Sequence, residues 1–271
     1  MGRRLLATAT AIVTAAALAG TAAAATADAP TLVSSNWAGY AAVAPDGQSL
    51  SFANATGTWV VPRVTCTSSR SDAVAFWVGL GGYSNDSPAL EQLGTAAECS
   101  GLGTPPTYYA WWEVVPAASV RIGLKVHPGD RITAGVAVDG QKVVLSLHDL
   151  THGTRFSHVQ VSTQQLDVSS AEWIAEAPAS CASASSCTPI PLTNFRGVTF
   201  TNIAATGNAH PGTLTDSTWV ATPIELITGS DQGRLLGDVD PLGPGVGAVP
   251  GAVSADGRSF AVTWQQGLQP G

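Results

Sequence analysis

The chain has 271 residues, of which only 11% are charged, and its net charge is −7 at pH 7. Because nucleic-acid binding needs a basic surface that neutralises phosphates, this composition excludes nucleic acid as a partner and argues against binding to anionic membranes. A low number of charges of either sign suits an acidic environment. Carboxylates become neutral in acid, and a chain with few Lys and Arg residues then has few cations that repel one another.

Residues 1–29 are typical of a secretory signal peptide with an approximate cleavage site. A short basic segment contains Arg3-Arg4, an apolar run extends over residues 7–19, and small residues of the Ala-x-Ala type recur over residues 22–29. The two arginines leave both the general secretory and the twin-arginine export routes open. The apolar run is short for a membrane span, and no later segment is long enough. We therefore expect an extracellular protein whose mature chain, residues 30–271, forms one domain.

Strand patterns dominate the mature sequence, and helix signals are nearly absent. Short β-branched and aromatic runs alternate with Gly, Pro, Asn and Asp, which predicts an all-β fold built as an antiparallel sandwich or barrel. The Gly/Pro-rich segment Asp238–Gly251 is expected to be a surface loop before the last strand. The predicted strands are Gly57–Val61, Val74–Leu80, Ala89–Gly94, Tyr108–Val115, Ser119–Val126, Arg131–Val138, Lys142–Leu147, Val159–Ser162, Ala171–Glu176, Arg196–Asn202, Trp219–Thr228 and Ser259–Gln265.

Four cysteines follow the signal segment, and an even number in an exported chain suggests two disulfides. We expect Cys181 to pair with Cys187 across a tight loop, and Cys66 to pair with Cys99 across a long one. Metal binding is the rival use of these residues. Since the chain has neither a Cys-x-x-Cys nor a His-x-His spacing, we expect no metal and no cofactor.

Motifs for nucleophilic catalysis are missing from the chain. It has no Gly-x-Ser-x-Gly, no Asp-Thr-Gly or Asp-Ser-Gly pair, and no cysteine left over once both disulfides form. The histidines lie mostly next to turns and are more typical of surface residues than of catalysts: His127, His148, His152, His158 and His210. What remains for catalysis is a set of acidic and aromatic residues on the predicted strands.

Two carboxylates, Glu172 and Glu176, lie four residues apart on one face of the strand at 170–176, beside Trp173 and Ile174. Burial in such apolar surroundings raises the pKa of a carboxylate, which suits a general acid or base that works at low pH. The alternative is a half-exposed strand whose acids point to solvent.

Strand alternation groups further residues on common faces. Trp111 and Glu113 share a face of their strand, whereas Gln92 points away from its neighbour Glu91. In the alternative, the tryptophans belong to the core and the acids line its rim. A concave sheet could present five side chains together: Trp77, Gln92, Trp111, Glu113 and Glu176.

Together these segments resemble the glutamic peptidases, or eqolisins, a family of secreted acid endopeptidases. The resemblance runs in order and at compatible spacing from Ser35 to about Phe200. It implies a jelly-roll (concanavalin-like) β-sandwich with a concave catalytic face, a Gln/Glu catalytic pair and no metal. The matching segments are Ser35-Asn36-Trp37-Ala38-Gly39, Trp77-Val78-Gly79-Leu80, the strand that contains Gln92, Tyr108-Tyr109-Ala110-Trp111-Trp112-Glu113 and Ala171-Glu172-Trp173-Ile174-Ala175-Glu176.

The resemblance assigns roles to individual residues. Gln92 falls at the family's glutamine position. Glu176 keeps the family's spacing to the small disulfide loop, five residues before Cys181, and is the expected catalytic glutamate, with Glu172 as the alternative. Four residues match those around the family's substrate cleft: Trp37, Trp77, Trp111 and Glu113.

Three positions depart from the family pattern, which often has Asp at Gly81, Asp at Tyr109 and Tyr at Val115. Losing these polar groups should alter the contacts with substrate and the hydrogen bonding around Glu113 more than the type of reaction.

The expected function is therefore that of a secreted, monomeric acid endopeptidase that hydrolyses protein or peptide substrates. Water activated by glutamate and glutamine would attack the peptide bond without a covalent intermediate. Two alternatives stay open. A concave, tryptophan-rich face with two carboxylates also suits a glycosidase, and a carbohydrate- or protein-binding module without activity would carry its acids at the rim.

Overall fold

The computed structural model describes residues 30–66, 68–84, 87, 89–183, 186–227 and 246–266, and the side chains of residues 180–189 lie outside this description as well. The predicted signal peptide, residues 1–29, falls outside the described residues. The regular elements of the described residues are all strands. Among these residues there is no helix long and apolar enough to cross a membrane.

The described residues form eighteen strands, in agreement with the all-β prediction. They are β1 (Leu32–Ser34), β2 (Trp37–Val43), β3 (Phe52–Val60), β4 (Asp72–Gly81), β5 (Leu90–Cys99), β6 (Thr107–Val114), β7 (Val120–Ile122), β8 (Arg131–Asp139), β9 (Lys142–Asp149), β10 (Thr154–Val161), β11 (Ser170–Glu176), β12 (Ala179–Ser183), β13 (Ser186–Pro189), β14 (Gly197–Gly207), β15 (His210–Gly212), β16 (Val220–Ile227), β17 (Val246–Pro250) and β18 (Phe260–Gln266).

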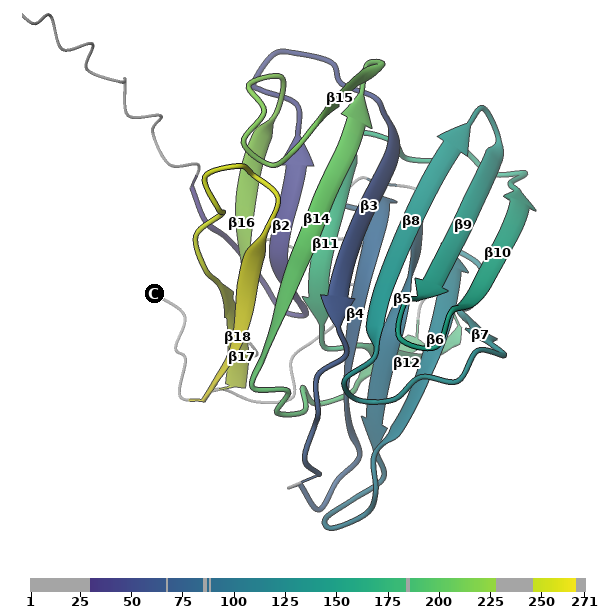
Figure 1. Cartoon of the computed structure of the whole chain (residues 1–271), viewed down its shortest axis with the longest axis vertical. Coiled ribbons are helices and arrows are strands. Elements are labelled where there is room, and N and C mark those ends of the chain that lie inside the picture. The colour runs from purple at the N-terminus through teal and green to yellow at the C-terminus, as the bar shows by residue number, and fades with distance from the viewer. Residues whose placement is uncertain are drawn as a thin grey trace, which may run out of the picture.

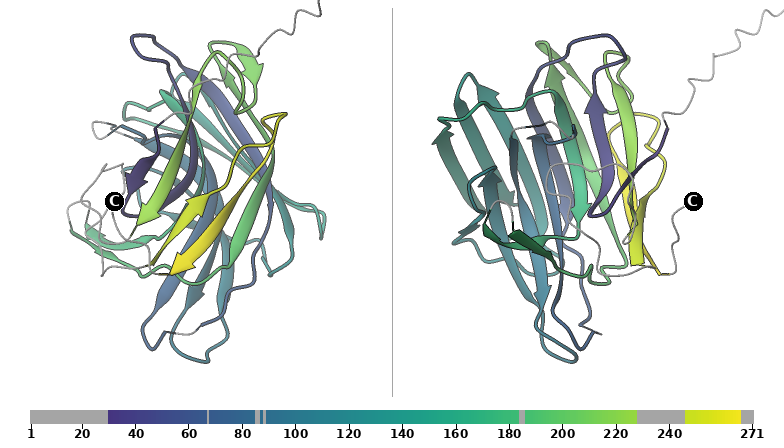
Figure 2. Two further views of the ribbon diagram at one scale, coloured as in Figure 1. Left: turned by 90° about the vertical axis from the view of Figure 1, so that its left-hand side faces the viewer. Right: turned by 180° about the vertical axis from the view of Figure 1, so that it is seen from behind.

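Sixteen of these strands form one sheet that folds over itself into the two layers of a β-sandwich (Figures 1 and 2). The strand order is β10-β9-β8-β3-β14-β18-β17-β16-β2-β11-β4-β5-β6-β7, with β1 beside β16 and β15 beside β14. In Figure 1, the layer with β14, β3, β8, β9 and β10 lies in front of the layer with β11, β4, β5 and β6. The strand pairs are antiparallel except for β1 and β16, which run parallel.

Strand β14 belongs to both layers. Its first residues, Gly197–Phe200, pair with β18, and its later residues, from Thr201 to Gly207, pair with β3. The register shifts between Thr201 and Ala204, and Asn202 at this point has a φ of 51°. An irregularity of this kind bends a strand and increases its twist, which lets one strand turn from the first layer into the second.

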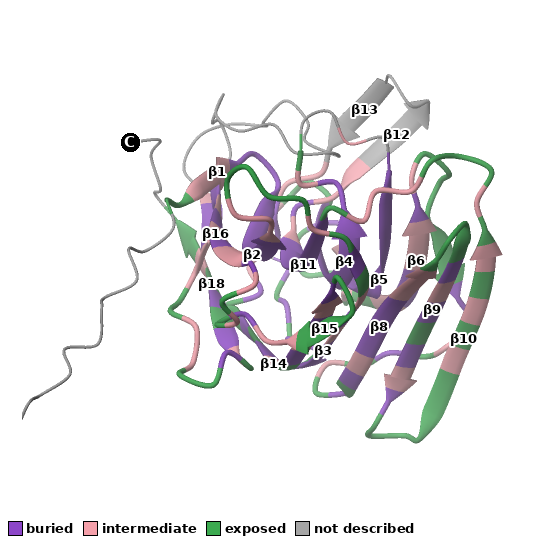
Figure 3. Cartoon of the chain, turned by 90° about the horizontal axis from the view of Figure 1, so that it is seen from above, coloured by how far each residue is buried: buried purple, intermediate pink, exposed green. Residues whose placement is uncertain are grey.

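Alternation of side chains separates two apolar clusters. On β4, Phe76 and Val78 point into the core between the layers, while Trp77 points to the opposite side. We call that opposite side of β2, β11, β4, β5 and β6 the tryptophan face. Its apolar cluster contains Trp37, Ala41, Ala75, Trp77, Leu90, Ala96, Trp111, Ile174 and Ile224. Figure 3 shows that β4 and β11 are buried along nearly their whole length, whereas β10 is largely exposed.

Most predicted strands are present. Strands β1, β12, β13 and β15 were not predicted, the strand predicted at Val159–Ser162 already begins at Thr154, and three further corrections follow. Of the segment expected to be a loop, residues 238–245 lie outside the described residues, whereas Val246–Pro250 forms β17, which pairs with β16 on one side and β18 on the other. Strand β2 was not among the predicted strands, although Trp37 was singled out. The strand predicted at Ser119–Val126 shortens to Val120–Ile122.

One predicted disulfide is confirmed. Cys66 bonds to Cys99 and ties the segment after β3 to the end of β5. The side chains of the second predicted pair, Cys181 and Cys187, lie outside the described residues. The backbone nevertheless places these two positions opposite each other in the two-stranded hairpin β12–β13.

Candidate active site

Five adjacent strands bring the six predicted site residues to the tryptophan face. Strand β2 carries Trp37, β4 carries Trp77, β5 carries Gln92, β6 carries Trp111 and Glu113, and β11 carries Glu176. The common face predicted for Trp77 and Trp111 is confirmed, since both belong to one apolar cluster, and Trp37, which the resemblance singled out, belongs to the same cluster. Hydrogen bonds then divide the polar residues into two pairs.

The first pair joins Glu176 to Trp77. The indole Nε1 of Trp77 donates to Oε2 of Glu176 at 2.7 Å, and Nδ2 of Asn36 donates to Oε1 at 3.4 Å. Trp37 packs edge-on against Trp77, with ring centroids 4.9 Å apart. Both carboxylate oxygens of Glu176 are thus oriented by N–H donors, while the residue itself is only partly buried and accessible to water.

The second pair joins Gln92 to Glu113. Nε2 of Gln92 donates to Oε2 of Glu113 at 2.8 Å. Burial raises the pKa of Glu113 to about 7, against the effect of hydrogen bonds from Gln92 and from the backbone of Ser119. Oε1 of Gln92 is buried and has no hydrogen-bond partner among the described residues. An unsatisfied buried acceptor is costly, so this oxygen is a ready acceptor for a water or a substrate N–H.

The alternative glutamate, Glu172, has a different environment. It is fully buried, and neither of its oxygens has a hydrogen-bond partner among the described residues. Burial raises its pKa well above the ordinary value, and the carboxylates of Asp167 and Glu91 add to this effect. Glu172 is therefore a neutral carboxylic acid at acid pH.

A glycine separates Glu172 from Gln92. In the register of the sheet, Gly79 lies opposite Glu172 on one side and Gln92 on the other. A Cβ at this position would lie 2.9 Å from Cζ3 of Trp77 and 3.1 Å from the carbonyl oxygen of Glu91. The indole that holds Glu176 therefore needs a residue without a side chain at position 79.

Asp167 is a residue that the sequence reasoning missed. It accepts hydrogen bonds from the backbone N–H of Gly82 and from the hydroxyl of Ser87. A Cβ at Gly81 would lie 2.7 Å from the Cβ and 3.0 Å from the Cγ of Asp167. A carboxylate from the β10–β11 connection thus occupies the space next to Gly81, where the resemblance led us to expect an aspartate. No local sequence signal marks it, because the two segments are far apart in the chain.

Tyr109, the second departure, is part of a charged group at the edge of the same sheet. Its hydroxyl donates to Oε1 of Glu98 at 2.5 Å, and the guanidinium of Arg121 lies 3.8 Å from the centre of its ring. Arg121 in turn forms a salt bridge of 2.8 Å with Glu98. The position therefore keeps a hydrogen-bonding side chain, engaged by neighbours on β5 and β7.

The chain is similar to a known protein family and to several solved structures. A family model described as the Peptidase A4 family matches residues 35–236. A crystal structure of scytalido-glutamic peptidase with a transition state analog inhibitor is similar at a TM-score of 0.65 and 26% identity, over 85% of this chain and 98% of that chain. SCP-B, a member of the eqolisin family of peptidases in a complex with the tripeptide Ala-Ile-His, matches at a TM-score of 0.60 and 24% identity over 85% and 98% of the two chains.

Aspergilloglutamic peptidase from Aspergillus niger matches at a TM-score of 0.52 and 24% identity, over 71% of this chain and 99% of that chain. No curated protein matches the chain in a sequence search. The fold is thus similar to these structures over nearly their full lengths.

Proposed function

The chain belongs to the Peptidase A4 family and is a glutamic endopeptidase, and on this premise we propose that Glu176 and Gln92 carry out its hydrolysis of peptide bonds at acid pH. The proposal includes residues 1–29 as a secretory signal peptide and residues 30–271 as a secreted, monomeric catalytic domain. The observation that carries it is the pair of oriented groups on one face: a carboxylate held by Trp77, and an amide held by Glu113.

Glu176 is the general base in this proposal. Its carboxylate takes a proton from a water molecule as that water attacks the carbonyl carbon of the scissile peptide bond. The protonated Glu176 then passes the proton to the nitrogen of the departing amine. Hydrogen bonds from Trp77 and Asn36 support this role, because they fix the carboxylate in one orientation without removing it from water.

Gln92 holds the water and stabilises the oxyanion. Its Oε1, buried and without a partner among the described residues, can accept a hydrogen bond from the attacking water. A primary amide has two N–H donors. One is engaged by Glu113, and the other can donate to the negative charge that develops on the carbonyl oxygen. An amide suits this role because it donates without titrating.

The environments of the two glutamates favour Glu176 over Glu172 as the base. A general base must be ionised and within reach of water, and Glu172 is fully buried with a pKa raised well above its ordinary value. Glu176 is partly exposed and accepts hydrogen bonds from two N–H groups, those of Asn36 and Trp77.

The substrate is a protein or peptide chain in this proposal. The three tryptophans are buried, with Trp37 and Trp77 fully so and Trp111 6% exposed, and therefore support the site from beneath: Trp77 by its hydrogen bond to Glu176, and Trp37 by its packing on Trp77. Glu113 takes part by anchoring Gln92, and its carboxyl is neutral below about pH 7, so it adds no negative charge near the oxyanion at acid pH.

The test is cleavage of an unfolded protein by purified residues 30–271 from about pH 2 to about pH 7, with Glu176→Gln and Gln92→Ala as variants. Pepstatin and a metal chelator serve as inhibitor controls. We expect proteolysis at acid pH that resists both inhibitors and is lost in both variants. Cleavage that persists in Glu176→Gln would remove this residue from the mechanism, and the absence of cleavage by a folded protein would favour the glycosidase or binding alternatives.

A further inference from the structure

Two turns lie side by side in the layer away from the tryptophan face. One turn, His127–Asp130, leads into β8, and the other, Asp149–His152, follows β9. They are neighbours because β8 pairs with β9 in a register that places Ile132 opposite Asp149. In each turn a histidine and an aspartate lie three residues apart, and the two turns carry them in opposite order.

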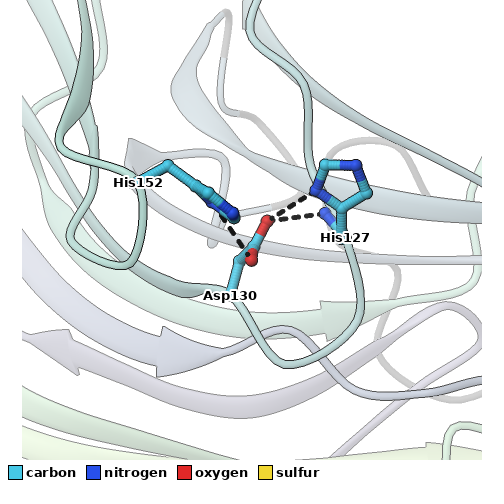
Figure 4. Close-up of side chains that lie close together, drawn as sticks. All are labelled: His127, Asp130 and His152. Atoms are coloured by element: carbon cyan, nitrogen blue, oxygen red, sulfur yellow. Dashed lines mark hydrogen bonds and ion pairs between the residues drawn. The ribbon is translucent and has the colours of Figure 1, made fainter.

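Three side chains from these turns converge, as Figure 4 shows. Nδ1 of His127 lies 3.3 Å from Oδ2 of Asp130, and Nδ1 of His152 lies 3.4 Å from Oδ1 of the same carboxylate. Potential ligand atoms of these three residues all lie within 4.8 Å of one another. A fourth group is near, since Oδ2 of Asp149 lies 2.8 Å from Nδ1 of His152.

The two contacts of Asp130 are spaced as the ligands of a metal ion are, whereas the 2.8 Å contact of His152 with Asp149 is that of a hydrogen bond, which a bound ion would replace. A charge-assisted hydrogen bond between nitrogen and oxygen is about 2.7–2.9 Å long, shorter than the two contacts of Asp130. For tetrahedral Zn²⁺ with ligands at about 2.0–2.1 Å, neighbouring ligand atoms are about 3.3 Å apart. Small shifts of the imidazoles would therefore complete a coordination sphere.

The two carboxylates are held in place by the turns themselves. The backbone N–H of His127 donates to Oδ2 of Asp130 at 2.7 Å, and the N–H of Thr151 donates to Oδ1 of Asp149 at 2.8 Å. Both aspartates are buried. Because the backbone fixes them whether or not an ion is bound, the oxygen half of the site is preorganised.

The two imidazoles are accessible from solvent. The side chains of His127 and His152 are 60% and 48% exposed, and both line a hollow of about 600 Å³. Lys125 and Arg155 also line this hollow. The two buried aspartates supply the negative charge that a dication needs against these two cations.

We propose that His127, Asp130 and His152 form a binding site for a divalent metal ion of the Zn²⁺ class, with Asp149 as the fourth donor. Mixed imidazole and carboxylate ligands suit zinc and its neighbours, whereas Mg²⁺ and Ca²⁺ prefer oxygen ligands alone. The ion binds Nδ1 of both neutral imidazoles, each of which then carries its one proton on Nε2; at His152, Nδ1 gives up its proton to solvent as Nε2 takes one from it, and coordination replaces the hydrogen bond to Asp149. The site joins the turn before β8 to the turn after β9, and it is independent of the peptidase mechanism.

The test uses the mature chain, treated with a chelator and dialysed, at about pH 7.5, because protons compete with metal ions for these ligands in acid. Calorimetric titration with Zn²⁺ gives the stoichiometry and affinity, and the visible absorption of added Co²⁺ reports tetrahedral coordination. The variants are His127→Ala and His152→Ala. The matched control is His210→Ala, because His210 is also about half exposed and lies 2.9 Å from a single carboxylate, that of Asp216.

We expect one ion per chain, and a loss of affinity in each site variant beyond the roughly 10–100-fold that removal of an outer partner causes. The His210 variant should bind as the unchanged protein does. Acid proteolysis that is equal in all the variants would show that each is folded. The proposal is overturned if Zn²⁺ does not bind saturably, or if binding survives in both site variants, or if the control loses it equally.

Discussion

Trp77 donates its indole N–H to the carboxylate of Glu176 at a distance of 2.7 Å. The two residues are 99 positions apart in the chain and meet because β4 and β11 are neighbours in the sheet. The donor belongs to a rigid ring that is itself fully buried, so the position of the Glu176 oxygen depends on the packing of that ring. If Glu176 and Gln92 act as proposed, the activity depends on how Trp77 is packed as well as on these two residues.

Replacing Glu176 and Glu172 by glutamine, one at a time, tests which of the two is the general base. Glu176→Gln should lower kcat by roughly 10²–10⁴-fold, the range typical of general acid–base catalysis. Glu172→Gln should keep most of the activity at acid pH, because the buried acid is already neutral there. Initial rates on an unfolded protein, with circular dichroism as a check on folding, would measure both. The opposite result, inactive Glu172→Gln beside active Glu176→Gln, would exchange the assignments.

Glu113 offers a test of how Gln92 is oriented. Glu113→Gln should remain within a few-fold of the unchanged protein in acid, since a neutral carboxyl and an amide both accept the N–H of Gln92. Glu113→Ala removes the acceptor and should lower kcat by an amount approaching the roughly 10²-fold that loss of an oxyanion donor causes. Equal kcat in the two variants would show that the contact does not orient the amide.

Gly79 is predicted to be a steric requirement of the site. Because a Cβ would lie 2.9 Å from the Trp77 ring, Gly79→Ala should displace the indole, cost about 1–3 kcal/mol in the free energy of unfolding and lower kcat. Gly123→Ala is the matched control, since a Cβ there has no atom within 4 Å. Urea unfolding and initial rates measure the two effects. A fully active and stable Gly79→Ala would contradict the packing argument.

Stability should fall as pH rises. Burial raises the pKa of Glu91 from 4.5 to about 8, so between these values the folded state binds a proton that the unfolded state has lost. The free energy of unfolding then decreases as pH rises, by up to about 1.4 kcal/mol per pH unit for each such group. The stabilisation from Glu91 is fully present below about pH 4.5 and is lost above about pH 8.

Glu91→Gln should remove part of this slope, while Asp46→Asn, at an exposed carboxylate, should leave it unchanged. Denaturant unfolding at several values between pH 4 and about pH 8 provides the measurement. A slope that is the same in the unchanged protein and in Glu91→Gln would mean that Glu91 ionises without cost in the folded state.

The Cys66–Cys99 bond should contribute substantially to stability. The two residues are 33 positions apart, and closing a loop of this length in the unfolded chain corresponds to about 3–4 kcal/mol. The double variant Cys66→Ser, Cys99→Ser should therefore unfold at a lower denaturant concentration, with its activity under folding conditions retained. A midpoint that does not move would show that the native loop is as ordered without the bond.

The arrangement of the tryptophan face could largely be predicted from the sequence, because strand alternation is a local property. It correctly placed Trp111, Trp77 and Gln92 on one side and Glu91 on the other. The contact of Trp77 with Glu176 was beyond prediction, because it depends on which strands are neighbours.

Other features depend on which strands pair with each other in the sheet. His127 and His152 were predicted to be surface residues, and their side chains are indeed about half exposed. Both histidines approach Asp130 because of the β8–β9 register. The sequence did contain a local sign of this cluster, since His-x-x-Asp at 127–130 is followed by the reverse spacing, Asp-x-x-His, at 149–152. Strand β17 was missed because Gly- and Pro-rich residues favour loops, and two flanking strands overrode that preference.

The passage of β14 from one layer to the other has a consequence for a protein that digests other proteins. Since β14 pairs with β18 in one layer and with β3 in the other, separating the two layers would break the pairing of this strand on one side. The shared strand therefore couples the unfolding of the two layers. Such coupling limits the length of extended chain that one molecule can offer to the active site of another.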